Sequence, residues 1–251
     1  MTLLSRTNGQ RWLRRLPLVV ASLLLFLPLV RLVDSAVASS WTPTGPMTSP
    51  RAGATATLLL NGRVLITGGS TGTGVTASAE IFDPATSAFS PTGSMTTWRA
   101  AHTATRLPDG RVLIVGGETG NSGLGTAELY NPATGTFALT GSMGTTRMQH
   151  AAVLLPDGRV LVLGGEDTTH APLASAEVYN PATGQFSPTG AMTTTRRLHP
   201  RAILLPDGWV LVAGGELYNN GPILSSAETY DSTQKAYLGE HPAASVFIFL
   251  A

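Results

Sequence analysis

Short apolar stretches alternate with turn residues along most of the chain, and this pattern suits strands rather than helices. Residues 150–155 form one apolar run, and residues 159–163 form a second. Pro156-Asp157-Gly158 lies between them. Because Pro presets φ and Gly accepts a positive φ, this tripeptide predicts a tight turn between two strands.

The same stretch continues with two further predicted strands. Residues 166–175 are polar and without a period, whereas residues 176–179 alternate small or apolar with polar positions, as a half-buried strand does. A second turn, 180–184, leads into residues 185–188 around Phe186. The whole pattern predicts a four-stranded antiparallel meander, and we find no helical apolar stripe after residue 38.

This unit recurs four times, at steps of 48, 48 and 50 residues between its Gly-Gly pairs. The pairs are Gly68-Gly69, Gly116-Gly117, Gly164-Gly165 and Gly214-Gly215. A period near 50 with four strands indicates the blades of a repeat protein, each too small to bury its faces alone. We expect each Gly pair to end the second strand beside a neighbouring backbone, where a Cβ would collide.

Other residue types recur in step with the glycines. Glutamates on the third strand are Glu80, Glu128, Glu177 and Glu228. Arginines ahead of the first strand are Arg51, Arg99, Arg147 and Arg196. Fourth-strand aromatics are Phe89, Phe137, Phe186 and Tyr237, with Trp41 as a fifth. Methionines are Met47, Met95, Met143 and Met192. We expect the Arg and Glu residues to pair within or between blades, and the Met and aromatic residues to fill the space between blades.

The joint pattern resembles the kelch repeat, the unit of kelch-type β-propellers, over about residues 41–237. The resemblance implies an all-β fold of four-stranded antiparallel blades, of which about four are visible. Family members usually carry Trp at the fourth-strand aromatic position, which only Trp41 does here. The repeat units are about 41–88, 89–136, 137–185 and 186–237, within a propeller region of 39–237.

The two ends of the chain differ from the repeats. Four arginines precede an uncharged run, 16–30, that is shorter than the roughly 20 residues of a membrane span. With the small-x-small pattern of Ala36-Val37-Ala38, this predicts a signal peptide, 1–38, and an exported protein that is secreted, periplasmic or at the cell surface. An uncleaved membrane anchor is the alternative. Residues 238–251 form a divergent tail that lacks the repeat pattern. Two interpretations follow: a shortened gene product with an incomplete ring, or a tight four-bladed ring.

We also expect residues 41–45 to form a stray fourth strand ahead of the first blade. Fifteen Arg against one Lys predict a bacterial source. After residue 38, ten Arg and one Lys face fourteen acidic residues, so the propeller region carries no basic face for nucleic acid.

Composition also narrows the candidate chemistry. The chain has no cysteine, which excludes a disulfide framework. Kelch-type copper oxidases need a cysteine cross-linked to a tyrosine, so that site is excluded as well. There is no Gly-x-Ser-x-Gly or His-Glu-x-x-His motif. His102, His150 and His199 recur three residues after the repeated Arg, but in different blades, too far apart to share a metal. We therefore expect no cofactor, no metal and no catalytic residue.

Recognition is expected in the loops between the second and third strands, because they differ in sequence and have lengths of 9, 9, 10 and 11 residues. Candidate binding residues are Glu118, Asn121, Glu166, Asp167, His170, Glu216, Tyr218 and Asn219. We predict an exported, non-catalytic interaction module that binds a protein or a glycan through these loops. The alternatives are a carbohydrate-active enzyme that uses the carboxylates after the Gly pairs, and a fragment without activity of its own.

Overall fold

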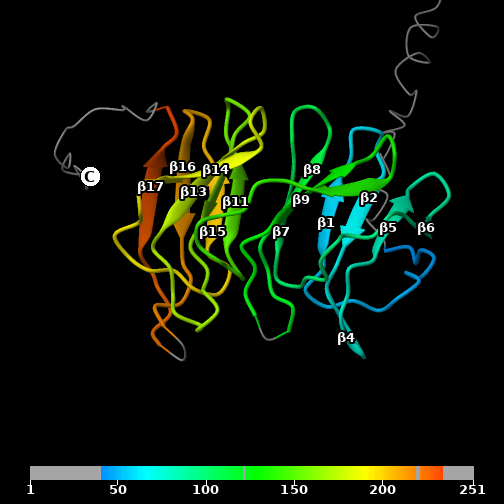
Figure 1. Ribbon diagram of the computed structural model, residues 1–251, viewed down its shortest axis with the longest axis horizontal. Helices are drawn as coiled ribbons and strands as arrows, with labels where there is room; N and C mark the ends of the chain where they lie inside the picture. The colour runs from blue at the N-terminus through cyan, green and yellow to red at the C-terminus, as the bar shows by residue number, and fades with distance from the viewer. Residues whose placement is uncertain (1–40, 121, 219–220, 234–251) are drawn as a thin grey trace, which may run out of the picture. The chain divides into compact units, whose positions relative to one another are not determined.

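A computed structural model describes residues 41–120, 122–218 and 221–233, and every regular element among them is a strand (Figure 1). The first sheet contains β1 Thr55–Leu58, β2 Val64–Thr67, β5 Ala79–Asp83 and β6 Ala88–Pro91. The second contains β7 Thr103–Arg106, β8 Val112–Val115, β9 Ala127–Asn131 and β10 Thr136–Leu139. The third contains β11 Ala151–Leu154, β12 Val160–Leu163, β13 Ala176–Asn180 and β14 Gln185–Thr189.

The fourth sheet has three described strands, β15 Arg201–Leu204, β16 Trp209–Ala213 and β17 Ala227–Asp231. Within each of the four sheets, every strand pairs antiparallel with the next one along the chain. A two-stranded hairpin of β3 Ser70–Thr71 and β4 Gly74–Val75 forms within the loop between β2 and β5. The predicted all-β fold of antiparallel blades is therefore confirmed.

The tight turns follow from their sequences. In the second sheet the amide of Gly110 donates to the carbonyl of Leu107, and Gly110 has a φ of 89°. The side chain of Asp109 accepts from the amide of Arg111 at 3.0 Å, which fixes the turn before β8 begins. Such turns need no tertiary support, so each repeat carries its own hairpin geometry.

Burial along the second strand of each sheet shows where neighbouring sheets lie. Every residue of β8 and of β12 is buried, because a sheet covers each of their two faces. In β2 and in β16 burial alternates from residue to residue. Among the described residues, the first and fourth sheets are thus covered on one face only, and the described blades do not form a closed ring.

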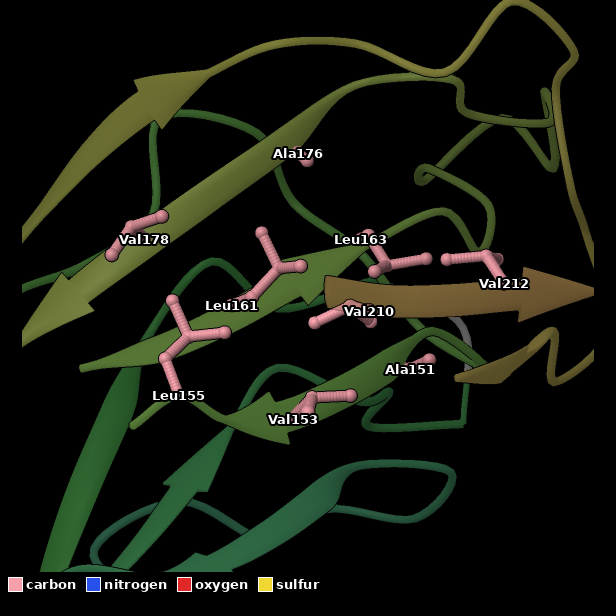
Figure 2. Packing of buried hydrophobic residues seen from close by; sticks show 9 residues of the cluster. All are labelled: Ala151, Val153, Leu155, Leu161, Leu163, Ala176, Val178, Val210 and Val212. Atoms are coloured by element: carbon pink, nitrogen blue, oxygen red, sulfur yellow. The ribbon is translucent and has the colours of Figure 1, made fainter. Parts of the chain in front are cut away.

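Apolar side chains fill the three junctions between successive sheets. At the junction of the third and fourth sheets, Leu161 and Leu163 of β12 face Val210 and Val212 of β16 (Figure 2). Met95 and Met143 occupy the two preceding junctions, as the repeat predicted. Partly buried Phe137 and Phe186 pack against the same clusters. Their ring centroids lie 4.8 and 4.9 Å from those of Tyr130 and Tyr179 in their own blades, with the ring planes tilted.

The expectation of a strand at residues 41–45 is wrong. No strand forms there, and Trp41 is fully exposed, because no described strand lies beside it to supply hydrogen bonds. The amide of Gly45 still donates to the carbonyl of Ser87, as Gly93 donates to Gly135 one repeat later. The predicted leader, 1–38, and tail, 238–251, lie outside the described residues, as does Tyr237.

Candidate functional site

The repeated arginines and glutamates pair within each blade. The Nη2–Oε1 distances are 2.8 Å for Arg51–Glu80, 2.8 Å for Arg99–Glu128, 3.0 Å for Arg147–Glu177 and 3.1 Å for Arg196–Glu228. All four arginine side chains are at most 1% exposed. The first three pairs therefore lie inside the blades, whereas the glutamate of the fourth, Glu228, is 19% exposed.

Each arginine also holds the end of the second strand. Nη1 of Arg99 donates to the carbonyls of Gly116 and Thr126, so the guanidinium ties the linker before β7 to the loop after β8 and to the start of β9. Nη1 of Arg147 makes the corresponding bonds to Gly164 and Ser175. A planar fork of five donors suits this arrangement, which an ammonium group does not reproduce.

The partner glutamates fix the linker as well. Glu80 accepts from the amide of Thr48 at 2.7 Å. Burial opposes the charged form of Glu80, but the bonds from Thr48 and Arg51 outweigh it and hold the pKa of this carboxyl below its ordinary value. The amides of Thr193 and Thr194, with Arg196, likewise lower the pKa of Glu228 against the effect of burial. These carboxylates therefore stabilise the structure of the blade.

The Gly pairs form the junction between blades. The amide of the second glycine donates to the carbonyl of the next repeat's arginine: Gly69 to Arg99 at 2.9 Å, Gly117 to Arg147 at 3.0 Å, and Gly165 to Arg196 at 2.8 Å. A Cβ on Gly68, Gly116 or Gly164 would meet the same arginine carbonyl at 2.2, 2.5 or 2.8 Å. Close backbone approach therefore requires glycine here.

Two of the repeated histidines are buried at these junctions. Nε2 of His102 lies 3.0 Å from the hydroxyls of Thr55 and Thr67, and Nε2 of His150 lies 2.9 Å from Thr103. Burial, with the charge of Arg99, lowers the pKa of His102 to about 3. Burial, then Arg147 and the other two histidines, lowers the pKa of His150 well below its ordinary value. Both rings are neutral at pH 7.

The expected equivalence of His199 to these two histidines is wrong. The fourth repeat has one extra residue before its first strand, so Pro200 takes the place of His150 beside the preceding Gly pair. His199 is exposed, and its amide donates to the carbonyl of Gln149, as Gln149 donates to Ala101. Burial and Arg201 lower the pKa of His199, and the charge of Glu166 opposes them.

The loops between second and third strands gather along one edge of the sheets, opposite the tight turns (Figure 1). Two of these loops meet at an ion cluster that we name the Arg197 cluster, consisting of Glu166, His170, Arg197 and Glu216. Arg197 donates through Nε to Glu166 and through Nη1 to Glu216 at 2.9 Å. Nδ1 of His170 lies 3.2 Å from Glu166.

The Arg197 cluster combines a buried base with an exposed rim. The Glu166 side chain is 1% exposed, whereas that of His170 is 59% exposed. Partial burial opposes the charge of Arg197, but the bonds and charges of Glu166 and then Glu216 raise its pKa. Arg197 replaces the small or apolar Ala52, Ala100 and Met148 of the other repeats, and this departure is the signal that our sequence reasoning missed.

The remaining predicted loop residues are dispersed. Asp167 turns inward on its own loop, where it accepts from the amides of Thr169 and Ala171. Its hydrogen bond from the Thr169 hydroxyl lowers its pKa. Tyr218 is exposed, Glu118 is half-buried away from the cluster, and Asn121 and Asn219 lie outside the described residues.

A shallow depression of about 420 Å³ also opens on the loop edge, lined by Ser49, Pro50 and residues 71–76. No member of the Arg197 cluster lines it. Within the described ranges, no three His, Asp or Glu side chains are grouped so as to hold a metal ion. No helix there is long and apolar enough to cross a bilayer.

Four antiparallel sheets joined in series through Gly–Arg backbone bonds define a β-propeller type of protein. The family model of the kelch motif matches residues 50–96, 99–144 and 147–193, together more than half of the chain. The chain therefore belongs to the kelch-repeat family. The fourth repeat lies outside these matches from residue 194 on, but it has the same Arg–Glu pair and strand pairing. The comparison with curated proteins gave no match.

Proposed function

We propose that this chain is an exported, non-catalytic interaction module that binds a protein through the loops between the second and third strands of its blades. Kelch repeats generally mediate protein interactions, which supports the general role. The leader pattern of residues 1–38 supports export. A glycan is the alternative ligand, and a carbohydrate-active enzyme is the alternative activity.

The observation that carries the proposal is the contrast between uniform blades and unequal loops. The repeated Arg and Glu residues pair with each other within the blades. Among the described residues, the Arg197 cluster occurs at one junction only. Its buried carboxylate holds His170 at the surface. Exposed Trp98 and Tyr218 belong to the linker and loop segments of the same edge. Exposed Trp and Tyr side chains are frequent anchors in protein interfaces.

Charge indicates the kind of partner surface. The loops after the Gly pairs contain the acids Glu118, Glu166, Asp167 and Glu216 and no Lys or Arg. Glu166 and Glu216 are paired with Arg197, so the acids of this edge outside the Arg197 cluster are the partly exposed Glu118 and Asp167. A partner with a basic patch complements this edge, and rim charges of this kind accelerate association in a salt-dependent manner.

The two carboxylates of the Arg197 cluster accept hydrogen bonds from the same guanidinium group. Glu166 and Glu216 both bind Arg197, so one guanidinium lies between the two carboxylates. A glycosidase instead needs two carboxyl groups that flank the scissile bond of a sugar. The geometry thus supports a binding role for these side chains over an acid–base role.

Site-specific photo-cross-linking in the full chain tests this proposal. A photoreactive residue replaces Tyr218 on the loop edge or, as the control, exposed Thr183 on the tight turn after β13, and each variant is incubated with extract of the source organism. We expect a discrete adduct from position 218 only, weaker at high salt and lost when residues 167–175 are replaced by residues 119–126.

Two results would overturn the proposal. One is an equal yield of adducts from positions 218 and 183, which would mean that the loop edge has no preferred partner. The other is turnover of an oligosaccharide that Glu166→Gln abolishes, which would establish the enzyme instead. Retention on a glycan array without any protein adduct would favour the glycan ligand.

A further inference from the structure

The first and fourth sheets each leave one apolar face without a neighbouring sheet among the described residues. We define the open first face as Ala56, Leu58, Val64, Ile66 and Phe82, on the side of the first sheet that a preceding blade would cover. We define the open fourth face as the apolar residues Ile203, Leu205, Leu211, Ala213 and Ala227, with Arg201 and Thr229 beside them, on the side that a following blade would cover.

The open first face has the same residue pattern as the side of the second sheet that packs on the first sheet. In register, Val64 and Ile66 correspond to Val112 and Ile114 of the second sheet, and Phe82 corresponds to Tyr130. Those three residues are at most 2% exposed, because the first sheet covers them. Val64, Ile66 and Phe82 are only half-buried, and Leu58 is 57% exposed.

The open fourth face corresponds to the side of the third sheet that packs on the fourth sheet. Leu205 and Leu211 correspond to Leu155 and Leu161, which are buried against the fourth sheet (Figure 2). Ile203 corresponds to buried Val153 but is 61% exposed. The open first face therefore keeps the apolar pattern of an internal junction, and the open fourth face keeps it except at Arg201 and Thr229, which correspond to Ala151 and Val178.

Backbone groups at the two ends are also the two halves of a missing hydrogen bond. At each internal junction the second glycine donates to the next arginine carbonyl. Continuing this series, Gly215 would donate to the carbonyl of Arg51, and neither group has a hydrogen-bond partner among the described residues. Similarly, Ala101 donates to Gly53 and His199 donates to Gln149, which leaves the amide of Gly53 and the carbonyl of His199 without partners there.

Gly214 gives a third indication. A Cβ on any of the three corresponding glycines would collide with the following blade, but a Cβ on Gly214 would meet nothing within 4 Å. The carbonyl of the next arginine and the side chain of the next methionine lie beside Gly68 and beside Gly116. Among the described residues, the corresponding space beside Gly214 is empty. The fourth blade therefore keeps the form of a junction whose other side is absent from the described residues.

We propose that a second copy of this chain supplies that other side. The open fourth face of each copy packs on the open first face of the other, so that two equal junctions join the copies. Each new junction buries apolar surface as the internal ones do and makes the Gly215–Arg51 and Gly53–His199 backbone bonds. Two copies of four blades give eight, the upper end of the usual propeller range, and two head-to-tail contacts close the assembly.

The mass of the full chain in solution tests this proposal, by size-exclusion chromatography with light scattering over a concentration series. We expect twice the 26.1 kDa of one chain. Ile203→Glu places a charge in each new junction and should weaken association at least about 100-fold. Ile203 is already exposed, so the variant should fold normally. Leu139→Glu is the matched control, because Leu139 is 62% exposed on an internal blade and should leave the mass unchanged.

A mixing experiment makes the test specific for the two faces. Leu58→Lys alone should also give single chains, but mixed with Ile203→Glu it should restore the double mass through one Glu–Lys junction and one unchanged junction. A single-chain mass of the unaltered protein at all concentrations overturns the proposal. So does association that Ile203→Glu leaves intact, or growth to masses beyond two copies.

Discussion

The repeated arginine connects three segments of its blade that are distant in sequence. Arg147 lies in the linker before β11, bonds the end of β12 through Gly164, and pairs with Glu177 of β13. Its side chain is fully buried, and its Nε finds no acceptor within the described part of the chain. Removing one member of such a pair leaves an uncompensated buried charge, which is costlier than the net contribution of the intact pair.

Arg147→Met should therefore lower the free energy of unfolding by about 3–5 kcal/mol. The control is Arg159→Met, which breaks the Arg159–Asp157 pair on a tight turn, where both side chains are well exposed. An exposed pair is worth about 1 kcal/mol or less. Denaturant unfolding of the three proteins checks this, and equal losses for the two variants would contradict the structural role of the buried pair.

The buried histidines make stability depend on pH. The pKa of His102 is about 3 in the folded chain and 6.5 in the unfolded one. Between these values the unfolded chain binds more protons, so the free energy of unfolding falls as pH decreases below about 6.5. One such group contributes a slope of up to about 1.4 kcal/mol per pH unit.

His102→Gln should remove that slope while keeping a polar group near Thr55 and Thr67. We expect the variant to lose less stability than the unaltered chain between pH 7 and pH 5, by up to about 1.4 kcal/mol per pH unit within the titration window. Urea unfolding at several pH values measures it. His170→Gln is the control, because His170 is mostly exposed. An unchanged slope in His102→Gln would mean that the folded and unfolded chains bind a proton at His102 equally well.

At the scale of elements, the strands and turns were predictable because each repeat carries its own signals. The Pro-Asp-Gly turn, the apolar second strand and the Ala-Glu-x-aromatic third strand all form as the sequence indicated. What single-repeat patterns do not contain is the presence of a neighbour. β8 and β2 have similar apolar sequences, yet only β8 is buried on both faces.

The errors at this scale have the same origin. Trp41 matches the repeat pattern, but a fourth strand forms only beside a third strand, and none is described there. His199 keeps the spacing from its arginine, but one added residue moves Pro200 into the buried position. The Arg197 cluster was foreseen only in part. Glu166, His170 and Glu216 were predicted as candidates. Arg197 was not, because it directly follows the repeated Arg196 and no motif distinguished it.

At the scale of the whole molecule, the residues that stabilise the blades are distinct from the loop residues that we propose for binding. The Arg–Glu pairs, Gly pairs and buried histidines build blades and junctions, whereas the residues that differ between repeats lie on the loop edge. The described blades do not form a closed ring, and apart from Arg201 and Thr229 their two open faces match the two sides of an internal junction. The proposed binding function and the proposed self-association therefore use different surfaces.

Hydrogen exchange of glycine amides, followed by NMR on the ¹⁵N-glycine-labelled full chain, tests the junctions most directly. The account predicts slow exchange at Gly69, Gly117 and Gly165, because each amide donates to the next blade's arginine carbonyl. Gly72 and Gly120, which make no hydrogen bond to the described residues, should exchange rapidly. If Gly117 exchanged as fast as Gly72, the blades would not be joined as described.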